Sequence, residues 1–305
     1  MIERLFKKAE KVLLIGIGGG GDILGCLPTA RYLDFLGVEN IIGGLTWERK
    51  KVDPKPGPRA MDEIRNIKLL SRTVGLANSK TRVGDMRFTE SIVAEHLGVE
   101  TILVDINEGV RGTCEGLHEA VKKLGVDLIV GIDVGGDCLA KGNEEGIRSP
   151  LADSTMLCVL KRMKIATVLG VIGYGSDGEL TLEELHRNIS EIAGMQGLLG
   201  ARGIGRGEAE ELQEILPKVY SEASYMVLEA AKGGYGEREI REGRRKLQLT
   251  PIATITFYFD PKVVYRFSNL AKIVDNSTSI WEADRALRKA GVTTELYFEL
   301  GMNTD

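Results

Sequence analysis

A run of four glycines follows the first apolar stretch of the chain, in the segment LIGIGGGGDILG between Leu14 and Gly25. The glycines occupy positions 18 to 21, and an aspartate, Asp22, comes directly after them. A backbone without side chains can turn sharply and can approach a ligand closely. Such a turn between an apolar strand and a helix is typical of an α/β sheet whose first loop exposes amide groups to an anion.

Short apolar runs rich in Val and Ile recur along the chain, and each ends in glycine or an acidic residue. They are Lys11–Ile17, Asn40–Leu45, Thr101–Val104, Leu128–Ile132, Ala166–Ile172 and Ile252–Phe259. Continuous apolar runs suit strands that are buried on both faces of a parallel sheet. Helical stretches separate the runs, so the sequence predicts a doubly wound, mostly parallel, Rossmann-like α/β sheet with helices on both faces.

The 305 residues are predicted to form a single α/β domain over positions 1–305, in which residues from about 180 to 250 form a mainly helical cap or subdomain. The run Thr293–Leu300 is expected to add an edge strand. The apolar surfaces of the expected helices exceed what one sheet covers, so we expect a homodimer.

Charge and cysteine usage narrow the function classes. A formal net charge of -4 with dispersed Lys and Arg argues against nucleic-acid binding, which requires clustered positive charge. No stretch approaches the roughly 20 apolar residues of a membrane span, so we expect no membrane partner. The four cysteines form no Cys-x-x-Cys pair, which favours free thiols in the cytoplasm. Abundant Glu, Lys and Arg with scarce Gln are typical of a heat-adapted source.

Carboxylates follow several of the expected strands, at the rim where ligands bind in an open parallel sheet. Asp22 follows the first run, Asp105 the third, Asp133 and Asp137 the fourth, and Asp260 the sixth. Carboxylates beside an anion-binding loop repel the anion unless a cation lies between them, and Mg²⁺ and Mn²⁺ prefer oxygen ligands. We therefore predict that Asp22, Asp133 and Asp137 hold Mg²⁺ or Mn²⁺. The alternative for Asp22 is that it only caps the following helix.

The segment 132–153, IDVGGDCLAKGNEEGIRSPLAD, is longer and more polar than a structural connection requires, which favours a binding loop. Arg148 is a candidate for holding a phosphate or carboxylate, and Glu144 and Asp137 are candidate catalytic, proton-transferring groups. Alternatively, Ser149 caps a helix and Arg148 makes a surface ion pair. The predicted substrate-binding residues are Gly18, Gly19, Gly20, Gly21, Gly135, Gly136, Arg148 and Ser149.

A dinucleotide-binding site is a second interpretation of the glycine run. Gly16, Gly18 and Gly21 fit the Gly-x-Gly-x-x-Gly pattern, and Glu48 follows the second expected strand in position for ribose hydroxyls. This interpretation implies an oxidoreductase that uses NAD(P) or a flavin, although Asp22 is an awkward neighbour for a pyrophosphate. A non-catalytic nucleotide sensor is a third alternative, because a pocket does not imply turnover.

Three stretches together resemble the uncharacterised family called domain of unknown function 1152, found in archaea and some bacteria. They are GGGGDILGCLPTARYLDFLG, DVGGDCLAKGNEEGIRSPLAD and GYGSDGELTLEEL, in this order along most of the chain. A more distant likeness links the second stretch to D-glutamate cyclase-like proteins and archaeal manganese-dependent phosphatases, which carry a Gly-Asp-Gly-Gly-Asn-Glu loop. Val134 and Asp137 depart from that loop. The resemblance implies no established reaction.

The combined observations favour a metal-assisted enzyme of the hydrolase type. We expect it to act at the carboxyl-end rim of the sheet on a small, anionic, phosphorylated or nucleotide-like compound. The glycines and Arg148 would receive the anionic group, while the aspartates would hold the metal ion.

Overall fold

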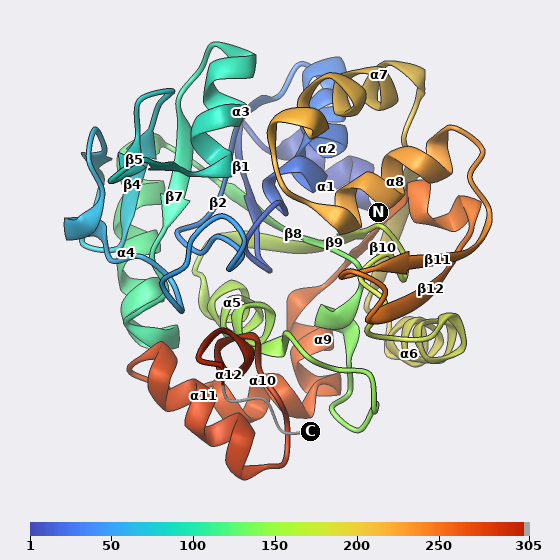
Figure 1. Cartoon of the computed structure of the whole chain (residues 1–305). Coiled ribbons are helices and arrows are strands. Elements are labelled where there is room, and N and C mark those ends of the chain that lie inside the picture. The colour runs from blue at the N-terminus through green and yellow to red at the C-terminus, as the bar shows by residue number, and fades with distance from the viewer. Residues whose placement is uncertain (302–305) are drawn as a thin grey trace.

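A nine-stranded sheet forms the centre of the computed structural model, which describes residues 1–301 (Figure 1). Five neighbouring strands of its middle are parallel and lie in the order β9, β8, β1, β2, β7. Their bounds are β1 Lys11–Gly16, β2 Glu39–Leu45, β7 Thr101–Val104, β8 Leu128–Val134 and β9 Ala166–Ile172. The predicted α/β fold with a mostly parallel, Rossmann-like sheet is therefore confirmed.

Antiparallel strands complete both edges of the sheet. On one side β13 (Ile255–Phe259) lies antiparallel to β9, and β10 (Leu198–Gly203) pairs with β13. On the other side β4 (Val74–Ala77) lies antiparallel to β7, and β3 (Lys68–Leu69) pairs with β4. The prediction that Ile252–Phe259 joins the parallel set was wrong. Residues of β13 on one face are only half-buried, but an apolar run of this kind carries no signal of strand direction. Because β13 is antiparallel, Asp260 lies at the opposite rim.

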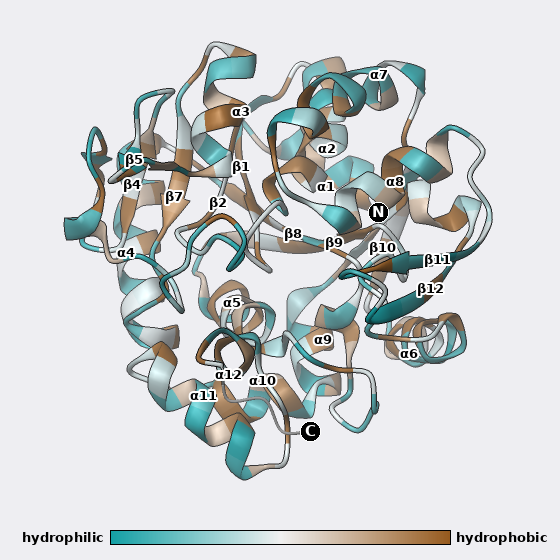
Figure 2. Cartoon of the chain, in the orientation of Figure 1, coloured by the Kyte–Doolittle hydropathy of each residue, from teal (hydrophilic) through white to brown (hydrophobic). Residues whose placement is uncertain are grey.

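Helices cover both faces of the sheet, and the side chains of β1 show why. Leu13 and Ile15 point into one apolar core, and Val12 and Leu14 point into the other. The first core is covered by α4 Gly109–Leu124, α5 Pro150–Arg162, α6 Leu182–Gly194, α9 Pro261–Phe267, α10 Asn269–Val274, α11 Ile280–Lys289 and α12 Glu295–Glu299. The second is covered by α1 Ile2–Lys8, α2 Ile23–Leu36, α3 Thr89–Leu97, α7 Arg206–Ile215 and α8 Glu222–Ala231. Figure 2 shows the apolar residues gathered along the central strands.

Short elements complete the described chain. The four 3-10 helices are η1 Met61–Glu63, η2 Asp137–Leu139, η3 Leu216–Lys218 and η4 Pro251–Thr254. Two small hairpins lie outside the main sheet, β5 Arg82–Val83 with β6 Met86–Arg87 and β11 Gly236–Ile240 with β12 Arg245–Leu249. No helix within residues 1–301 combines the length and the apolar character needed to cross a bilayer. All four cysteines are buried free thiols.

Two chain segments differ from what their sequences favour. The segment from about 180 to 250 contains α6, α7 and α8, but it also supplies the edge strand β10 and the β11–β12 hairpin. The run Thr293–Leu300 forms the helix α12, so its prediction as an edge strand was wrong. The hydroxyl of Thr294, a residue that favours strands, instead accepts a hydrogen bond from the Tyr297 N–H and starts the helix.

The strand order reverses direction between β1 and β8. From β1 the chain proceeds outward through β2 to β7, then returns to β8 beside β1 and proceeds outward through β9 on the other side. In open α/β sheets a crevice forms beyond the carboxyl ends of the strands at such a reversal. The loops after β1 and β8 diverge there because their helices lie on opposite faces of the sheet.

Candidate functional site

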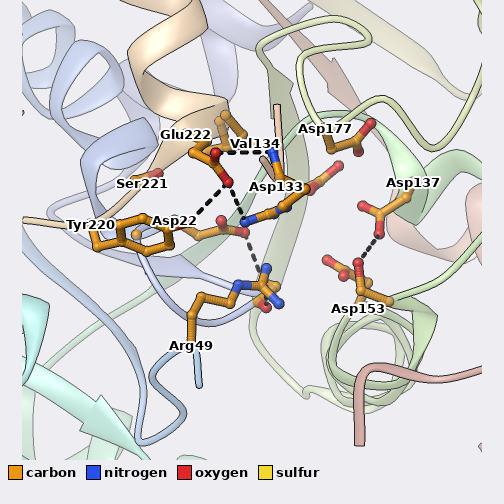
Figure 3. Close-up of a pocket in the computed structure, with 15 residues that line it drawn as sticks. Asp22, Arg49, Asp133, Val134, Asp137, Asp153, Asp177, Tyr220, Ser221 and Glu222 are labelled. Atoms are coloured by element: carbon orange, nitrogen blue, oxygen red, sulfur yellow. Dashed lines mark hydrogen bonds and ion pairs between the residues drawn. The ribbon is translucent and has the colours of Figure 1, made fainter. Parts of the chain in front are cut away.

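An acidic cavity lies at this strand reversal, beyond the carboxyl ends of β1 and β8 (Figure 3). Its volume of about 20 Å³ holds roughly one water molecule or a bare ion. The acidic lining residues are Asp22, Asp133, Asp137, Asp153, Asp177 and Glu222. The remaining lining residues are Gly18, Gly21, Arg49, Val134, Ser149, Tyr220, Ser221, Ala223 and Arg241. Residues between positions 18 and 241 that are far apart in the sequence therefore meet at one space.

Three of these carboxylates form a compact group, which we call the aspartate triad: Asp22, Asp133 and Asp153. One oxygen of each lies within 4.8 Å of an oxygen of the other two, and all three residues are buried. Asp22 follows the loop after β1, Asp133 is the penultimate residue of strand β8, and Asp153 is in the first turn of α5. The predicted set of Asp22, Asp133 and Asp137 thus overlaps the triad in two members.

The side chain of Asp22 does not cap α2, although the residue occupies the N-cap position. Its Oδ2 instead accepts a hydrogen bond from the Gly18 N–H at 2.9 Å. A Cβ atom at position 18 would lie 2.6 Å from Asp22 Oδ2 and 3.2 Å from Asp153 Oδ2. The glycine therefore leaves room for two triad carboxylates to close over the loop, and the capping alternative for Asp22 does not describe this structure.

Burial dominates the electrostatics of the triad. Burial raises the pKa of Asp22 to about 6, although Arg49 and the Gly18 N–H act in the opposite direction. The pKa values of Asp133 and Asp153 are also raised, first by burial and then by the neighbouring aspartates. Asp153 Oδ1 is buried and has no hydrogen-bond partner within residues 1–301. A cation bound to these oxygens would favour their charged forms and would give Asp153 Oδ1 a partner.

Asp137 and Asp177 extend the acidic lining beyond the triad. Asp137 Oδ2 accepts a hydrogen bond from the Ser149 hydroxyl at 3.3 Å, and burial followed by the charge of Asp153 raises the pKa of Asp137 well above its ordinary range. Burial and then Glu179 raise the pKa of Asp177 to about 7, and its Oδ2 is buried without a hydrogen-bond partner among residues 1–301. These two groups are therefore candidates for carrying a proton.

Two arginines, Arg49 and Arg241, supply positive charge to the lining of the cavity. The Arg49 guanidinium donates to the carbonyl oxygen of Gly18 at 3.3 Å, and within residues 1–301 it forms no ion pair at 4 Å or less. Arg241 donates from its backbone N–H and its side chain to Glu222. The pKa of Arg241 is lowered, first by burial and then by Arg49. An anion bound between these guanidinium groups would relieve their repulsion.

The start of α8, a helix that packs on the second apolar core, forms one wall of the cavity. A Cβ atom at Gly21 would clash with Ser221 Cβ, so the N-cap residue of α8 rests directly on the glycine loop. Tyr220 and Glu222 flank Ser221, and the Tyr220 hydroxyl donates to Glu222 Oε2 at 3.0 Å. Figure 3 shows Tyr220, Ser221 and Glu222 on one side of the cavity and Asp137, Asp153 and Asp177 on the other.

Glu144 and Arg148, predicted as a catalytic group and an anion-binding group, lie outside the cavity. Glu144 accepts the N–H groups of Lys141 and Gly142 and the side chain of Asn188, and these bonds outweigh burial and lower its pKa. The Arg148 guanidinium donates to the backbone carbonyls of Glu145 and Ile147. Both side chains therefore stabilise the loop before α5 rather than face a ligand.

The glycine amides are only partly available to an anion. The Gly18 N–H donates to Asp22 and the Gly20 N–H donates to the Trp47 carbonyl. The N–H groups of Gly135 and Gly136, predicted to bind the anion, donate in this structure to the Ile172 carbonyl and to Asp133 Oδ2, respectively. Gly135 has a φ of +144°, and a Cβ atom at this position would clash with Asp177 Oδ2. The absence of a side chain at Gly135 therefore leaves room for the Asp177 carboxylate.

Glu48 does not occupy the position that a dinucleotide would require. It is buried, and its carboxylate accepts the backbone N–H and the hydroxyl of Thr89 at the start of α3. Ser221 of α8 moreover covers Gly21, where a pyrophosphate would approach the loop. The Glu48 carboxylate is therefore not available to bind the ribose hydroxyls of NAD(P) in this structure.

Ser149, which lines the cavity, donates hydrogen bonds to Glu179, a buried residue that holds three elements together. Glu179 accepts the N–H groups of Arg148 and Ser149 at 2.6 and 2.9 Å, and it accepts the hydroxyl of Ser149. It also pairs with Arg245 of the β11–β12 hairpin at 2.7 Å. One carboxylate thus joins the start of α5, the loop after β9 and the hairpin.

We expect Glu179→Gln to lower the free energy of unfolding by about 3 kcal/mol, because an amide nitrogen cannot accept these bonds and leaves the Arg245 charge unpaired. Urea denaturation measures the change. Glu183→Gln on the exposed side of α6 is the control and should shift the stability by less than about 0.5 kcal/mol. Equal stabilities of the two variants would contradict the structural role of Glu179.

Several residues of the cavity carried little sequence signal. Asp153 stands inside a helix, and Arg49, Tyr220, Glu222 and Arg241 come from segments without a recognisable motif. The unusual backbone of Arg241, with φ of +55°, is visible only in the structure. The one available signal for Asp153 was its position in the first turn after Ser149-Pro150, at the end of the polar loop.

The family model described as "Protein of unknown function (DUF1152)" matches residues 13–303. Since this match covers most of the sequence, the chain belongs to that family, and the resemblance found in its motifs is confirmed. The chain has no match among the curated proteins or among the solved structures.

Proposed function

We propose that this member of the DUF1152 family is a metal-assisted hydrolase that acts on a small phosphate ester at the acidic cavity. The aspartate triad would hold Mg²⁺ or Mn²⁺, and Arg49 and Arg241 would bind the anionic group. The observation that carries the proposal is the convergence of three buried carboxylates within 4.8 Å, in a cavity that Arg49 and Arg241 also line.

The triad suits a divalent cation in three ways. Bonds of about 2.0–2.1 Å to Mg²⁺ place two ligand oxygens up to about 4.2 Å apart, so the triad oxygens, which lie within 4.8 Å of one another, need at most a small approach to share one cation. Asp153 Oδ1 lacks any other partner among residues 1–301, and Gly18 keeps the adjacent space free of a side chain. All donors are carboxylate oxygens, which favour Mg²⁺ and Mn²⁺ over softer metals.

The chain's own residues would then divide the chemical work. Arg49 and Arg241 bind phosphate oxygens and offset charge that develops during transfer. Asp137, whose pKa is raised by burial, holds a proton that it donates to the leaving oxygen. A bound divalent cation supplies polarisation of a phosphoryl oxygen and a water molecule of lowered pKa.

The direct test is phosphate release from a panel of small phosphomonoesters and nucleotides, with Mn²⁺, with Mg²⁺ and with chelator. Metal-dependent release in the wild type and its loss in Asp133→Asn are expected. Binding of the panel without any release would instead favour the nucleotide sensor. The NAD(P) alternative is checked by thermal shift at saturating cofactor.

Arg49→Met is expected to weaken the binding of inorganic phosphate to the Mn²⁺-loaded protein about 10-fold to 100-fold, because a charged hydrogen bond is lost. Isothermal titration calorimetry measures the change. Arg206→Met, which alters a side chain that is 93% exposed on α7, is the matched control and should leave phosphate affinity unchanged. Identical phosphate affinity in Arg49→Met and wild type would remove Arg49 from the site.

The remaining partner and location predictions rest on less specific features. A homodimer stays a prediction, which sedimentation analysis can check. The buried free thiols are consistent with the cytoplasmic location that we propose for the protein. The heat-adapted, archaeal source is likewise a proposal drawn from composition and motif resemblance.

A further inference from the structure

A second, larger pocket adjoins the acidic cavity on the far side of the start of α8. Its volume is about 350 Å³, compared with about 20 Å³ for the acidic cavity. We call it the outer pocket; its lining residues are Leu216, Val219, Tyr220, Ser221, Glu222, Tyr225, Met226, Glu239 and Ile240. A volume of this size accommodates an organic group of the size of an aromatic ring or larger.

The two spaces share one wall. Tyr220, Ser221 and Glu222 line both of them, and Arg241 of the acidic cavity is the direct neighbour of Ile240 in the outer pocket. Glu222 accepts hydrogen bonds from the Arg241 N–H at 2.9 Å and from its side chain at 3.1 Å. This pair of residues therefore forms the contact between α8 and the β11–β12 hairpin where the two spaces meet.

The outer pocket differs from the acidic cavity in chemistry. Leu216, Val219, Met226 and Ile240 give it an apolar lining, and Tyr225 adds an aromatic ring that is 54% exposed. Methionine and tyrosine side chains make favourable contacts with aromatic ligands. The outer pocket is largely apolar, and the acidic cavity is the proposed site of a cation and an anionic group. Together they match a ligand that carries an anionic group on an apolar body.

We propose that the outer pocket binds the aromatic or aliphatic body of a phosphate monoester whose phosphate group enters the acidic cavity. This inference rests on the proposed function and adds the substrate class to it. The small size of the acidic cavity requires that the phosphate displace a group there. Glu222 is the group that gives way, since its carboxylate holds the position on Arg241 that a phosphate oxygen would take.

The test uses two phosphonates, which cannot be hydrolysed, on the full-length Mn²⁺-loaded protein. Methylphosphonate probes the acidic cavity alone, and phenylphosphonate probes both spaces. We expect phenylphosphonate to bind at least about tenfold more tightly, because its ring is removed from water in the outer pocket. Calorimetry gives both dissociation constants.

Two variants locate this gain in the outer pocket. Val219→Trp fills the pocket from a half-buried position, and Tyr225→Ala removes the exposed ring without opening a core cavity. Each should reduce the advantage of phenylphosphonate to about twofold or less and leave methylphosphonate affinity unchanged. An advantage that persists in both variants would place the ring elsewhere and overturn the inference.

The remaining outcomes separate the inference from the function on which it rests. If both phosphonates bind the wild type equally well, the outer pocket is not a substrate site, while the metal-assisted function stands. If neither phosphonate binds the Mn²⁺-loaded protein, the proposed function is wrong and the inference falls with it.

Discussion

Asp153→Asn is expected to lower the affinity for Mn²⁺ at least about 100-fold, and to raise the thermal midpoint of the protein measured in chelator. Changes in groups that merely support metal ligands cost about 10-fold to 100-fold in affinity, and a direct ligand should cost at least as much. The stability gain has a different cause. Three buried carboxylates repel one another without a cation, and an asparagine amide can donate to Asp22 or Asp133 instead.

The opposite signs of these two effects make the experiment decisive. We expect the Asp153→Asn substitution to stabilise the metal-free protein by about 1 kcal/mol, as for other functional groups whose placement lowers stability. Asp105→Asn is a matched control because Asp105 is also buried at the end of a parallel strand. Its carboxylate is fully used by the N–H of Met61 and by Asn107.

Scanning calorimetry with chelator and with Mn²⁺, together with titration of Mn²⁺, gives both quantities. The control should lose stability in both conditions and bind Mn²⁺ like the wild type. Unchanged Mn²⁺ affinity in Asp153→Asn would exclude Asp153 as a ligand. A fall in stability in chelator would show that the triad is held by bonds other than those described.

The central strands were predictable because burial on both faces leaves a continuous apolar run. Thr101–Val104 and Ala166–Ile172 form strands with the predicted bounds. The edge strand β10 escaped prediction because its sequence, LLGARG, contains two glycines and an arginine and no continuous apolar run, and only Leu199 in it is buried. Burial made these segments recognisable as strands. It could not show the direction of a strand in the sheet, because a buried strand has the same composition in either direction.

The acidic half of the site was predictable and the basic half was not. Asp22, Asp133 and Asp137 lie at or after the carboxyl ends of two parallel strands, and these ends meet at one rim. Arg49 and Arg241 reach the same space from the loop after β2 and from a hairpin outside the main sheet, and only packing brings them together. Arg148 was the plausible choice by proximity in sequence, but two backbone carbonyls occupy its guanidinium.

Gly18→Ala should also reduce Mn²⁺ affinity at least about 100-fold, but it should destabilise the metal-free protein. The new methyl group would lie 2.6 Å from Asp22 Oδ2 and 3.3 Å from Asp153 Oδ1, so both carboxylates must move apart. Overpacking of this kind costs about 1–3 kcal/mol. The effect is steric, because the φ of Gly18 lies outside the left-handed region that alanine avoids.

Gly207→Ala in α7 is the control, since a Cβ there meets open space among residues 1–301. It should raise stability by up to about 1 kcal/mol through helix propensity and leave Mn²⁺ binding unchanged. Together with Asp153→Asn, the pair separates charge from space: both changes weaken metal binding, one stabilises the metal-free protein, and the other destabilises it. Wild-type Mn²⁺ affinity in Gly18→Ala would mean that the cation binds away from the glycine loop, and the aspartate triad would then lose its role as the metal centre.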